Sequence, residues 1–422
     1  MLDIPSPCVG ICRLDPATGL CAGCMRSIDE IAAWPEASSA ERLAIVQRLR
    51  ERRRAAGRTS AADSRPRRRR RAVEERSGPA GSAIRPAMDH TLHELLAVKT
   101  VLLADGAMGT SLFAQGLATG DSPELWNIDH PERVRAVHQG FIEAGSDLIL
   151  TNSFGANRCR LALHGAERRV AELNRAAAGL ARAAADRAGR TVLVAGSIGP
   201  TGEILQPIGA LARADAAAAF AEQAAALAEG GADLLWIETI SAAEELEAAI
   251  EGAAPTGLPI VATMTFDTHG RTMMGLSPAA AMGLRGQLAA RPAAFGANCG
   301  IGPAGLVESV LGLARAAKPG DLIVAKGNCG IPQYQDGHIH YDGTPAVMAD
   351  YACLARDAGA RIIGGCCGTT PAHLVAMAAA LASRPAGPPP DRATIEARLG
   401  PLPAPPDGDQ PERERRARRR RA

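Results

Sequence analysis

Short apolar runs alternate with longer Ala- and Leu-rich stretches throughout residues 89–385. The short runs have the length and the Val, Ile and Leu content of buried β-strands, whereas the longer stretches have helical length and spacing. Several helical stretches end in Ala-Gly or Gly-Gly just before the next apolar run, as helix C-caps do. The pattern predicts eight strands, at residues 101–105, 147–153, 191–197, 233–239, 259–265, 294–298, 321–327 and 361–365.

Regular alternation of strands and helices predicts a parallel sheet whose strands are joined by crossover helices. Eight such units in one continuous segment favour an α/β fold of the (β/α)₈ TIM-barrel type. The alternative is an open doubly wound sheet. It fits less well, because no G-x-G-x-x-G follows the first predicted strand.

The segments on either side of this region have different patterns. Residues 1–52 contain four closely spaced cysteines followed by a helical pattern, and they predict a small separate module. Residues 53–88 are rich in Arg, Ser, Ala, Gly and Pro without periodicity, which is typical of a disordered linker. Residues 386–422 are Pro-rich and then Arg-rich, and they predict a disordered tail.

The net charge of +2 conceals two strongly basic runs, at residues 65–71 and 413–421. Arginine-rich runs can bind nucleic acid, so a four-cysteine, Arg-rich nucleic-acid-binding protein is the alternative of a different functional class. These arginines lack the interleaved aromatic residues that nucleic-acid-binding surfaces use, and we interpret the runs as solvated tails.

No apolar run reaches the roughly 18 residues of a membrane span, and the first residues lack the pattern of a signal peptide. We therefore expect a cytoplasmic protein that does not bind membranes. In that compartment, ten cysteines indicate metal binding or catalysis rather than disulfides.

Residues capable of chemistry follow the predicted strands, where barrel enzymes place their active sites. Cys299 follows the sixth strand, and Cys366 and Cys367 follow the eighth within "GGCCGTTP". Strands six and eight lie two apart in a closed barrel, so the three thiols can converge. Three thiolates with an open fourth position are typical of catalytic zinc, and the flanking glycines allow the backbone to bend. Buried, inert cysteines are the alternative, and we expect Cys329, after the seventh strand, to be such a packing residue.

Five segments resemble the homocysteine S-methyltransferase family, and together they cover about residues 101–380. They are "LLADGAMGT", "ELWNIDHPERVRAVHQGFIEAGSDLILTNSFGAN", "GGADLLWIET", "FGANCG" and "IIGGCCGTTPAHLVAMA". The family includes betaine–homocysteine methyltransferase and the homocysteine-binding module of cobalamin-dependent methionine synthase. The resemblance implies a (β/α)₈ barrel with Zn²⁺ on three cysteines and homocysteine sulfur in the open position. It assigns zinc to Cys299, Cys366 and Cys367, the substrate amino group to Asp105 and Glu238, and pocket-shaping roles to Gly106 and Asn298.

The resemblance leaves the methyl donor open between betaine, a methylcorrinoid carried by a partner protein, and S-methylmethionine. A betaine site needs aromatic side chains around a quaternary ammonium, and the chain is only 3% aromatic. The aromatic candidates near the barrel mouth are Trp126, Phe154, Tyr334 and Tyr341. No cobalamin-binding module is visible, so a corrinoid donor requires a separate chain. The oligomeric state also stays open.

The first module contains "SPCVGICRLDPATGLCAGC", with cysteines spaced C-x₃-C-x₈-C-x₂-C. This segment resembles a small bacterial family of unknown function. Four neighbouring thiolates suit a structural zinc or an iron–sulfur cluster, and four unligated cysteines are the alternative. The candidate ligands are Cys8, Cys12, Cys21 and Cys24. Met88 would make a plausible start for the barrel alone, so we expect either two separate genes or a fusion.

Overall fold

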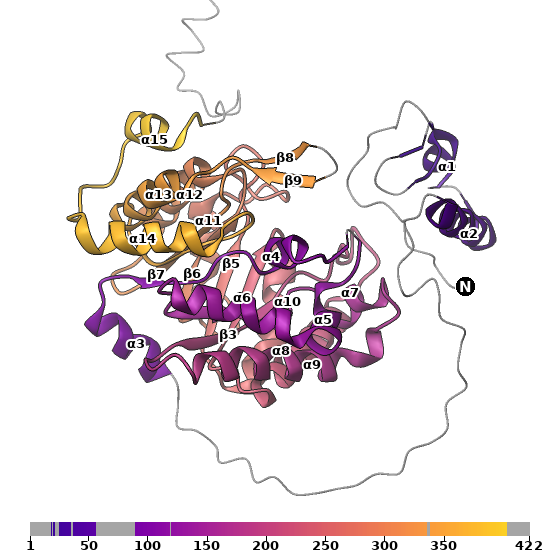
Figure 1. Cartoon of the computed structure of the whole chain (residues 1–422), viewed down its shortest axis with the longest axis horizontal. Coiled ribbons are helices and arrows are strands. Elements are labelled where there is room, and N and C mark those ends of the chain that lie inside the picture. The colour runs from indigo at the N-terminus through magenta and orange to yellow at the C-terminus, as the bar shows by residue number, and fades with distance from the viewer. Residues whose placement is uncertain are drawn as a thin grey trace, which may run out of the picture. The chain divides into compact units, whose positions relative to one another are not determined.

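Eight parallel strands form the centre of the larger of two units into which the chain divides (Figure 1). Their order is β1-β10-β7-β6-β5-β4-β3-β2, and a parallel bridge between Ala104 and Leu148 joins the two edge strands. The sheet therefore nearly closes, and the predicted (β/α)₈ barrel and its eight strands are confirmed. The strands are β1 (Leu102–Leu103), β2 (Leu148–Leu150), β3 (Leu193–Ile198), β4 (Leu234–Ile240), β5 (Ile260–Met264), β6 (Ala294–Cys299), β7 (Leu322–Gly327) and β10 (Ala360–Gly365).

The larger unit comprises Arg85–Leu117 and Ser122–Ala422, and the smaller one comprises Met1–Ile84 with Ala118–Asp121. The computed structural model describes residues 18, 20–21, 25–34, 37–55, 89–118, 120–335 and 338–402.

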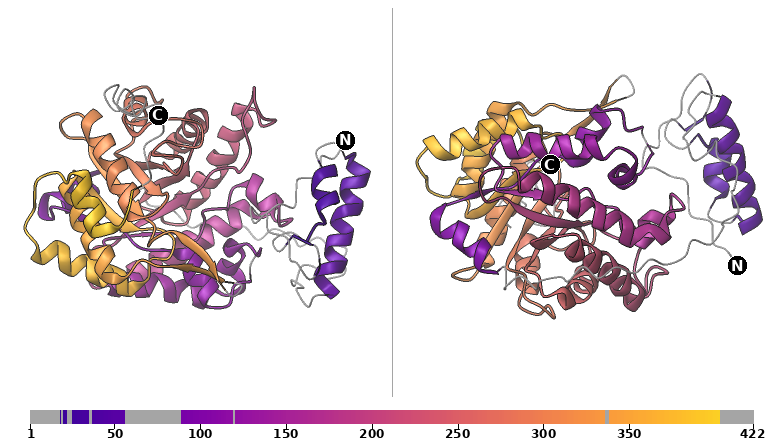
Figure 2. Two further views of the ribbon diagram at one scale, coloured as in Figure 1. Left: turned by 90° about the horizontal axis from the view of Figure 1, so that it is seen from above. Right: turned by 60° about the horizontal axis from the view of Figure 1, so that its bottom comes forward.

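Helices surround the strands, as the views in Figures 1 and 2 show. Ser277 and Thr344 cap two of these helices by accepting backbone N–H bonds, and a proline follows each at the first helical position. The helices between strands are α4 (Met108–Ala114), α5 (Trp126–Asp129), α6 (Pro131–Glu143), α7 (Arg158–Ala162), α8 (Val170–Ala185), α9 (Arg213–Glu229), α10 (Ala243–Ala253), α11 (Pro278–Leu284), α12 (Pro303–Ala316) and α13 (Pro345–Asp357), and α14 (Pro371–Ser383) follows the last strand. Single-turn 3₁₀ helices are also present: η2 (Pro123–Leu125), η3 (Glu167–Arg169) and η4 (Ala254–Thr256).

Side chains along each strand alternate between two apolar clusters. On β4, Leu234 and Trp236 join the cluster inside the barrel, whereas Leu235 and Ile237 pack in the cluster that includes the helices. Helix α3 (Asp89–Val98) contributes two leucines to the inner cluster. Every second residue of a strand points into the barrel. Polar residues at these inward positions near the strand ends therefore point towards the barrel axis.

Two elements differ from the sequence prediction. Between the seventh and eighth predicted strands lies an antiparallel hairpin that was not predicted, formed by β8 (Pro332–Gln335) and β9 (His338–Tyr341). The tail predicted from residue 386 contains helix α15 (Arg392–Leu399), whose Ile395 and Leu399 are buried against the core. The prediction of disorder is therefore wrong up to residue 402, because two apolar residues at helical spacing suffice to anchor one short helix.

The smaller unit contains helices α1 (Ile28–Ala33) and α2 (Ser39–Ala55), so residues 53–55 continue a helix rather than begin the predicted linker. Trp34, Ile45 and Leu49 form its apolar cluster. Cys21 is buried, whereas Cys8, Cys12, Cys24 and residues 56–88 lie outside the described part of the chain. The predicted four-cysteine metal site stays a prediction. Within the described residues, no helix is both long and apolar enough to cross a membrane.

Candidate zinc and substrate site

Three thiols meet at the carboxyl end of the barrel strands. Cys299 ends β6, Cys366 and Cys367 follow β10, and their three Sγ atoms lie within 4.8 Å of one another. Sulfurs bound tetrahedrally at ~2.3 Å from one ion would lie about 3.8 Å apart, so the cluster fits a single zinc. It is the one group of metal-ligand type found among the described residues. The predicted convergence of these cysteines is confirmed.

Asn298 ties the end of β6 to the end of β4. Its Nδ2 donates to Thr239 Oγ1 over 2.7 Å, and its Oδ1 accepts from Thr239 N over 2.8 Å. Thr239 has φ of 63° and Cys299 has φ of 61°, in the left-handed region that non-glycine residues rarely occupy. Such a conformation costs about 1–3 kcal/mol and persists only where surrounding contacts fix it. The buried Asn298 amide supplies those contacts. It therefore fixes the backbone at Thr239, next to Glu238, and at Cys299.

Asn328, which the sequence analysis did not single out, links the two cysteine segments. Its Nδ2 donates to Gly300 O over 2.7 Å and approaches Cys299 Sγ at 3.4 Å. Its Oδ1 accepts from the backbone N–H of Cys367 over 3.0 Å. Partners of this kind fix the direction of metal ligands and tune their charge.

The three thiols share protons unequally. Hydrogen bonds from Cys366 and Cys367 lower the pKa of Cys299, and the same contacts with Cys299 raise the pKa of Cys366 and of Cys367. Cys299 is therefore the member of the cluster that loses its proton most readily. A bound cation would favour release of the remaining protons.

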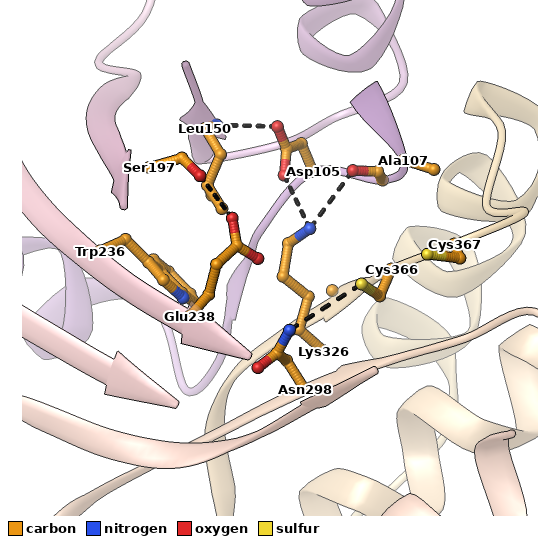
Figure 3. A network of polar contacts seen from close by, with 12 residues as sticks. Asp105, Ala107, Leu150, Ser197, Trp236, Glu238, Asn298, Lys326, Cys366 and Cys367 are labelled. Carbon is orange, nitrogen blue, oxygen red and sulfur yellow. Dashed lines mark hydrogen bonds and ion pairs between the residues drawn. The ribbon is translucent and has the colours of Figure 1, made fainter. Parts of the chain in front are cut away.

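Two carboxylates and a lysine lie beside the thiols inside the barrel (Figure 3). Glu238 Oε1 accepts a 2.5 Å hydrogen bond from Ser197 Oγ, and burial raises the pKa of Glu238 to about 7. Asp105 Oδ2 accepts from Leu150 N over 2.7 Å, and its Oδ1 lies 3.3 Å from the Nζ atom of Lys326. Burial also raises the pKa of Asp105. The structure thus brings both predicted carboxylates to the end of the barrel that carries the thiol cluster.

Lys326 was missed by the sequence analysis. Burial alone would lower its pKa, but Asp105 and then Cys366 and Glu238 raise it, so the side chain stays an ammonium. The signal was present in the strand pattern: Lys326 stands two residues after the inward-facing Val324 of β7. A lysine at an inward position is rare unless it is paired, and this position could have been recognised as part of the site.

Gly106 permits β1 to approach the loop that carries the paired cysteines. A Cβ atom here would lie 2.6 Å from Thr369 O and 2.7 Å from Phe141 Cε1. Gly106→Ala should therefore lower the free energy of unfolding by about 1–3 kcal/mol, measured by urea denaturation. Gly109→Ala is the matched control, because nothing lies within 4 Å of its Cβ position, and it should not destabilise the protein. Equal stability of the two variants would contradict the close packing at Gly106.

Cys329 is 1% exposed and packs in the large apolar cluster. Its Sγ donates to Gly343 O over 2.9 Å, and burial raises its pKa to about 11. His373 Nδ1 accepts from Thr370 N over 3.1 Å, so its Nε2, which lies 3.2 Å from Cys329 Sγ, carries hydrogen and cannot accept the thiol proton. These contacts support the predicted packing role.

The described aromatic residues proposed for a betaine cage each contact different parts of the protein. Trp126 is buried and stacks with Arg133 at 4.9 Å, whereas Phe154 is 37% exposed. Tyr341 lies over the cysteine loop, since a Cβ on Gly368 would be 2.3 Å from its ring. No ring contact joins these three side chains, all of which are described, and the Tyr334 side chain lies outside that part of the structure.

Comparison with known proteins gives two family matches. The family model described as homocysteine S-methyltransferase matches residues 102–381, and one for a protein family of unknown function, DUF1289, matches residues 6–53. Methionine synthase of Mycobacterium tuberculosis is 32% identical over 301 residues, which cover 67% of this chain and 25% of that protein. Methionine synthase of Mycobacterium leprae is 30% identical over 309 residues, covering 70% and 25%. The chain thus spans about a quarter of the length of these relatives.

Two solved structures are similar along nearly their whole length. The metallated form of the homocysteine methyltransferase MmuM from Escherichia coli has 29% identity and a TM-score of 0.58, covering 68% of this chain and 99% of that one. The oxidized form of the same protein has 29% identity and a TM-score of 0.59, covering 68% and 98%.

Proposed function

The chain belongs to the homocysteine S-methyltransferase family, and from this premise we propose that it methylates homocysteine to methionine at a zinc site. Cys299, Cys366 and Cys367 would hold the zinc. The observation that carries the proposal is the approach of their three Sγ atoms to within 4.8 Å at the carboxyl end of the barrel strands.

The residues of the cluster suit zinc in kind as well as in spacing. Three soft thiolates favour zinc over magnesium or calcium, and three protein ligands leave one position for substrate. Bound zinc would lower the pKa of the substrate thiol, so that it reacts as a thiolate at neutral pH. Asn298 and Asn328 hold the cysteine segments in place through the hydrogen bonds described above.

Glu238 provides the charge that would hold the substrate amino group. Its Oε1 is occupied by Ser197, and among the described residues Oε2 has no partner, so this oxygen is available to an ammonium. Asp105 is a second buried carboxylate, close enough to raise the pKa of Glu238 further. The burial of both carboxylates keeps water away and strengthens their attraction for a cation.

In the transfer itself, the homocysteine sulfur forms a bond to the methyl carbon of the donor. The bond between that carbon and the donor atom breaks, and its electron pair remains with the donor. The site residues contribute position and charge, which is how most of the barrier to such a displacement is lowered.

For the donor, we propose a methylcorrinoid protein or betaine, and two observations favour the corrinoid protein. The related methionine synthases have about three quarters of their length outside the matched region, which leaves room there for further modules. In addition, a cage for a quaternary ammonium needs several aromatic side chains, and the chain is only 3% aromatic. S-methylmethionine is a third candidate.

Supplying each donor separately would test the proposal. The purified, zinc-loaded full chain is incubated with homocysteine and with a methylated corrinoid protein, betaine or S-methylmethionine, and methionine is measured by mass spectrometry. We expect methionine with the corrinoid protein. If methionine forms only with betaine or only with S-methylmethionine, that compound is the donor and the corrinoid assignment is wrong. If no methionine forms with any of the three, the proposed activity is wrong.

A further inference from the structure

Lys326 places a buried ammonium group in the barrel interior, next to the thiol cluster. The residue is 3% exposed, and its Nζ donates to Gly106 O over 3.2 Å and lies 3.3 Å from Asp105 Oδ1. An ammonium carries three N–H donors. Within the described part of the chain no third acceptor contacts Nζ, so one donor remains for another group.

The pairing with Asp105 makes this lysine permanently charged, but it does not explain why a charge is present here. A buried ion pair contributes little to stability compared with an apolar pair of similar size. Asp105 already accepts from Leu150 N through Oδ2, so its carboxylate is engaged at both oxygens. What the pair leaves uncommitted is therefore the third N–H donor of Lys326.

Glu238 supplies a negative charge near Lys326 (Figure 3). No ion pair joins it directly to Lys326 in the described structure, and its Oε2 is uncommitted. Two opposite charges that no ion pair joins thus lie close enough to influence each other's pKa, and both lie near Cys366. The head group of an α-amino acid carries the complementary pair, an ammonium and a carboxylate on the same carbon.

We propose that Lys326 binds the α-carboxylate of the substrate while Glu238 binds its α-ammonium. The two residues together select an amino-acid thiol over thiols that carry only one of these charges. This inference rests on the proposed function, since it assigns the second half of the homocysteine head group. A hydrogen bond between charged groups changes affinity by about 10- to 100-fold.

Two truncated thiols separate the contributions. The ligand 3-mercaptopropylamine is homocysteine without its carboxylate, and 4-mercaptobutanoate is homocysteine without its amine. Calorimetry of the zinc-loaded full chain should show homocysteine binding about 10- to 100-fold more tightly than either. In Lys326→Met, the preference over 3-mercaptopropylamine should disappear and the preference over 4-mercaptobutanoate should persist. Lys326→Arg, which keeps the charge, should retain a measurable part of both preferences.

Several results would overturn the assignment. Equal binding of homocysteine and 3-mercaptopropylamine by the unmodified protein would do so without any variant, even if Lys326→Met failed to fold. A Lys326→Met protein with normal zinc content and an unchanged carboxylate preference would do so as well. Absence of homocysteine binding to the unmodified protein would instead contradict the proposed function, and the Lys326 assignment with it.

Discussion

Replacing Cys366 by alanine should remove both zinc and methyl transfer from this protein. Cys366 lies within 4.8 Å of Cys299 and Cys367, and two thiols cannot hold a catalytic zinc of the three-ligand kind. We expect the zinc content after dialysis to fall from about one ion per chain towards zero. Methionine formation should fall by more than about 100-fold, because even the loss of an outer partner of a metal ligand costs 10- to 100-fold.

Cys329→Ala is the matched control for this experiment. Cys329 also follows a barrel strand and is buried, but its thiol donates to Gly343 O and lies in the apolar cluster rather than in the thiol cluster. This variant should keep its zinc and its activity. Zinc retained in Cys366→Ala, or zinc lost equally from both variants, would contradict the assignment of the site.

Replacing Glu238 by glutamine should weaken homocysteine binding by about 10- to 100-fold and flatten its dependence on pH. Burial raises the pKa of Glu238 to about 7, so below that pH the side chain is mostly neutral and cannot attract an ammonium. The affinity of the unmodified protein should therefore fall as pH falls from 8 to 6. The substrate thiol titrates in both proteins, so the ratio of their affinities, measured by calorimetry, isolates the Glu238 contribution.

The raised pKa of Glu238 affects stability in the opposite direction: it favours the folded protein at low pH, whereas homocysteine binding is favoured at high pH. The folded state holds a proton on Glu238 that the unfolded state, with a pKa near 4.5, has already released. The contribution of this group to the free energy of unfolding is therefore largest at low pH and decreases between about 4.5 and 7. Glu245→Gln is the control, because Glu245 is also a buried carboxylate that accepts from a hydroxyl, but it belongs to α10 rather than to a barrel strand. A pH profile of binding that changes equally in both variants would contradict the role of Glu238.

The sequence predicts the barrel and the thiol cluster well, because both depend on short-range patterns. Buried parallel strands are largely apolar. Cys299 is the last residue of one of them, and Cys366 and Cys367 directly follow another. Strand order in a closed barrel then brings them together. Helix α15 and the β8–β9 hairpin escaped prediction, since each is a short element whose formation depends on packing rather than on a long periodic pattern.

The supporting residues of the site depend on three-dimensional geometry. The roles of Asn298 and Asn328 follow from left-handed backbone at Thr239 and Cys299 and from hydrogen bonds between segments that are 39 to 59 residues apart. Lys326 could have been found by continuing the inward series of β7, but a lysine inside a barrel has meaning only once its partner Asp105 is known. The four-cysteine module stays a prediction, because three of its cysteines lie outside the described residues.

The central claim is that three cysteines hold a zinc whose open position receives homocysteine sulfur. X-ray absorption at the zinc edge, recorded on the full chain with and without homocysteine, tests it without any methyl donor. We predict three sulfur ligands from the protein and one more when homocysteine is added. Fewer than three sulfur ligands in the free protein, or a sulfur count that homocysteine does not change, would contradict the account.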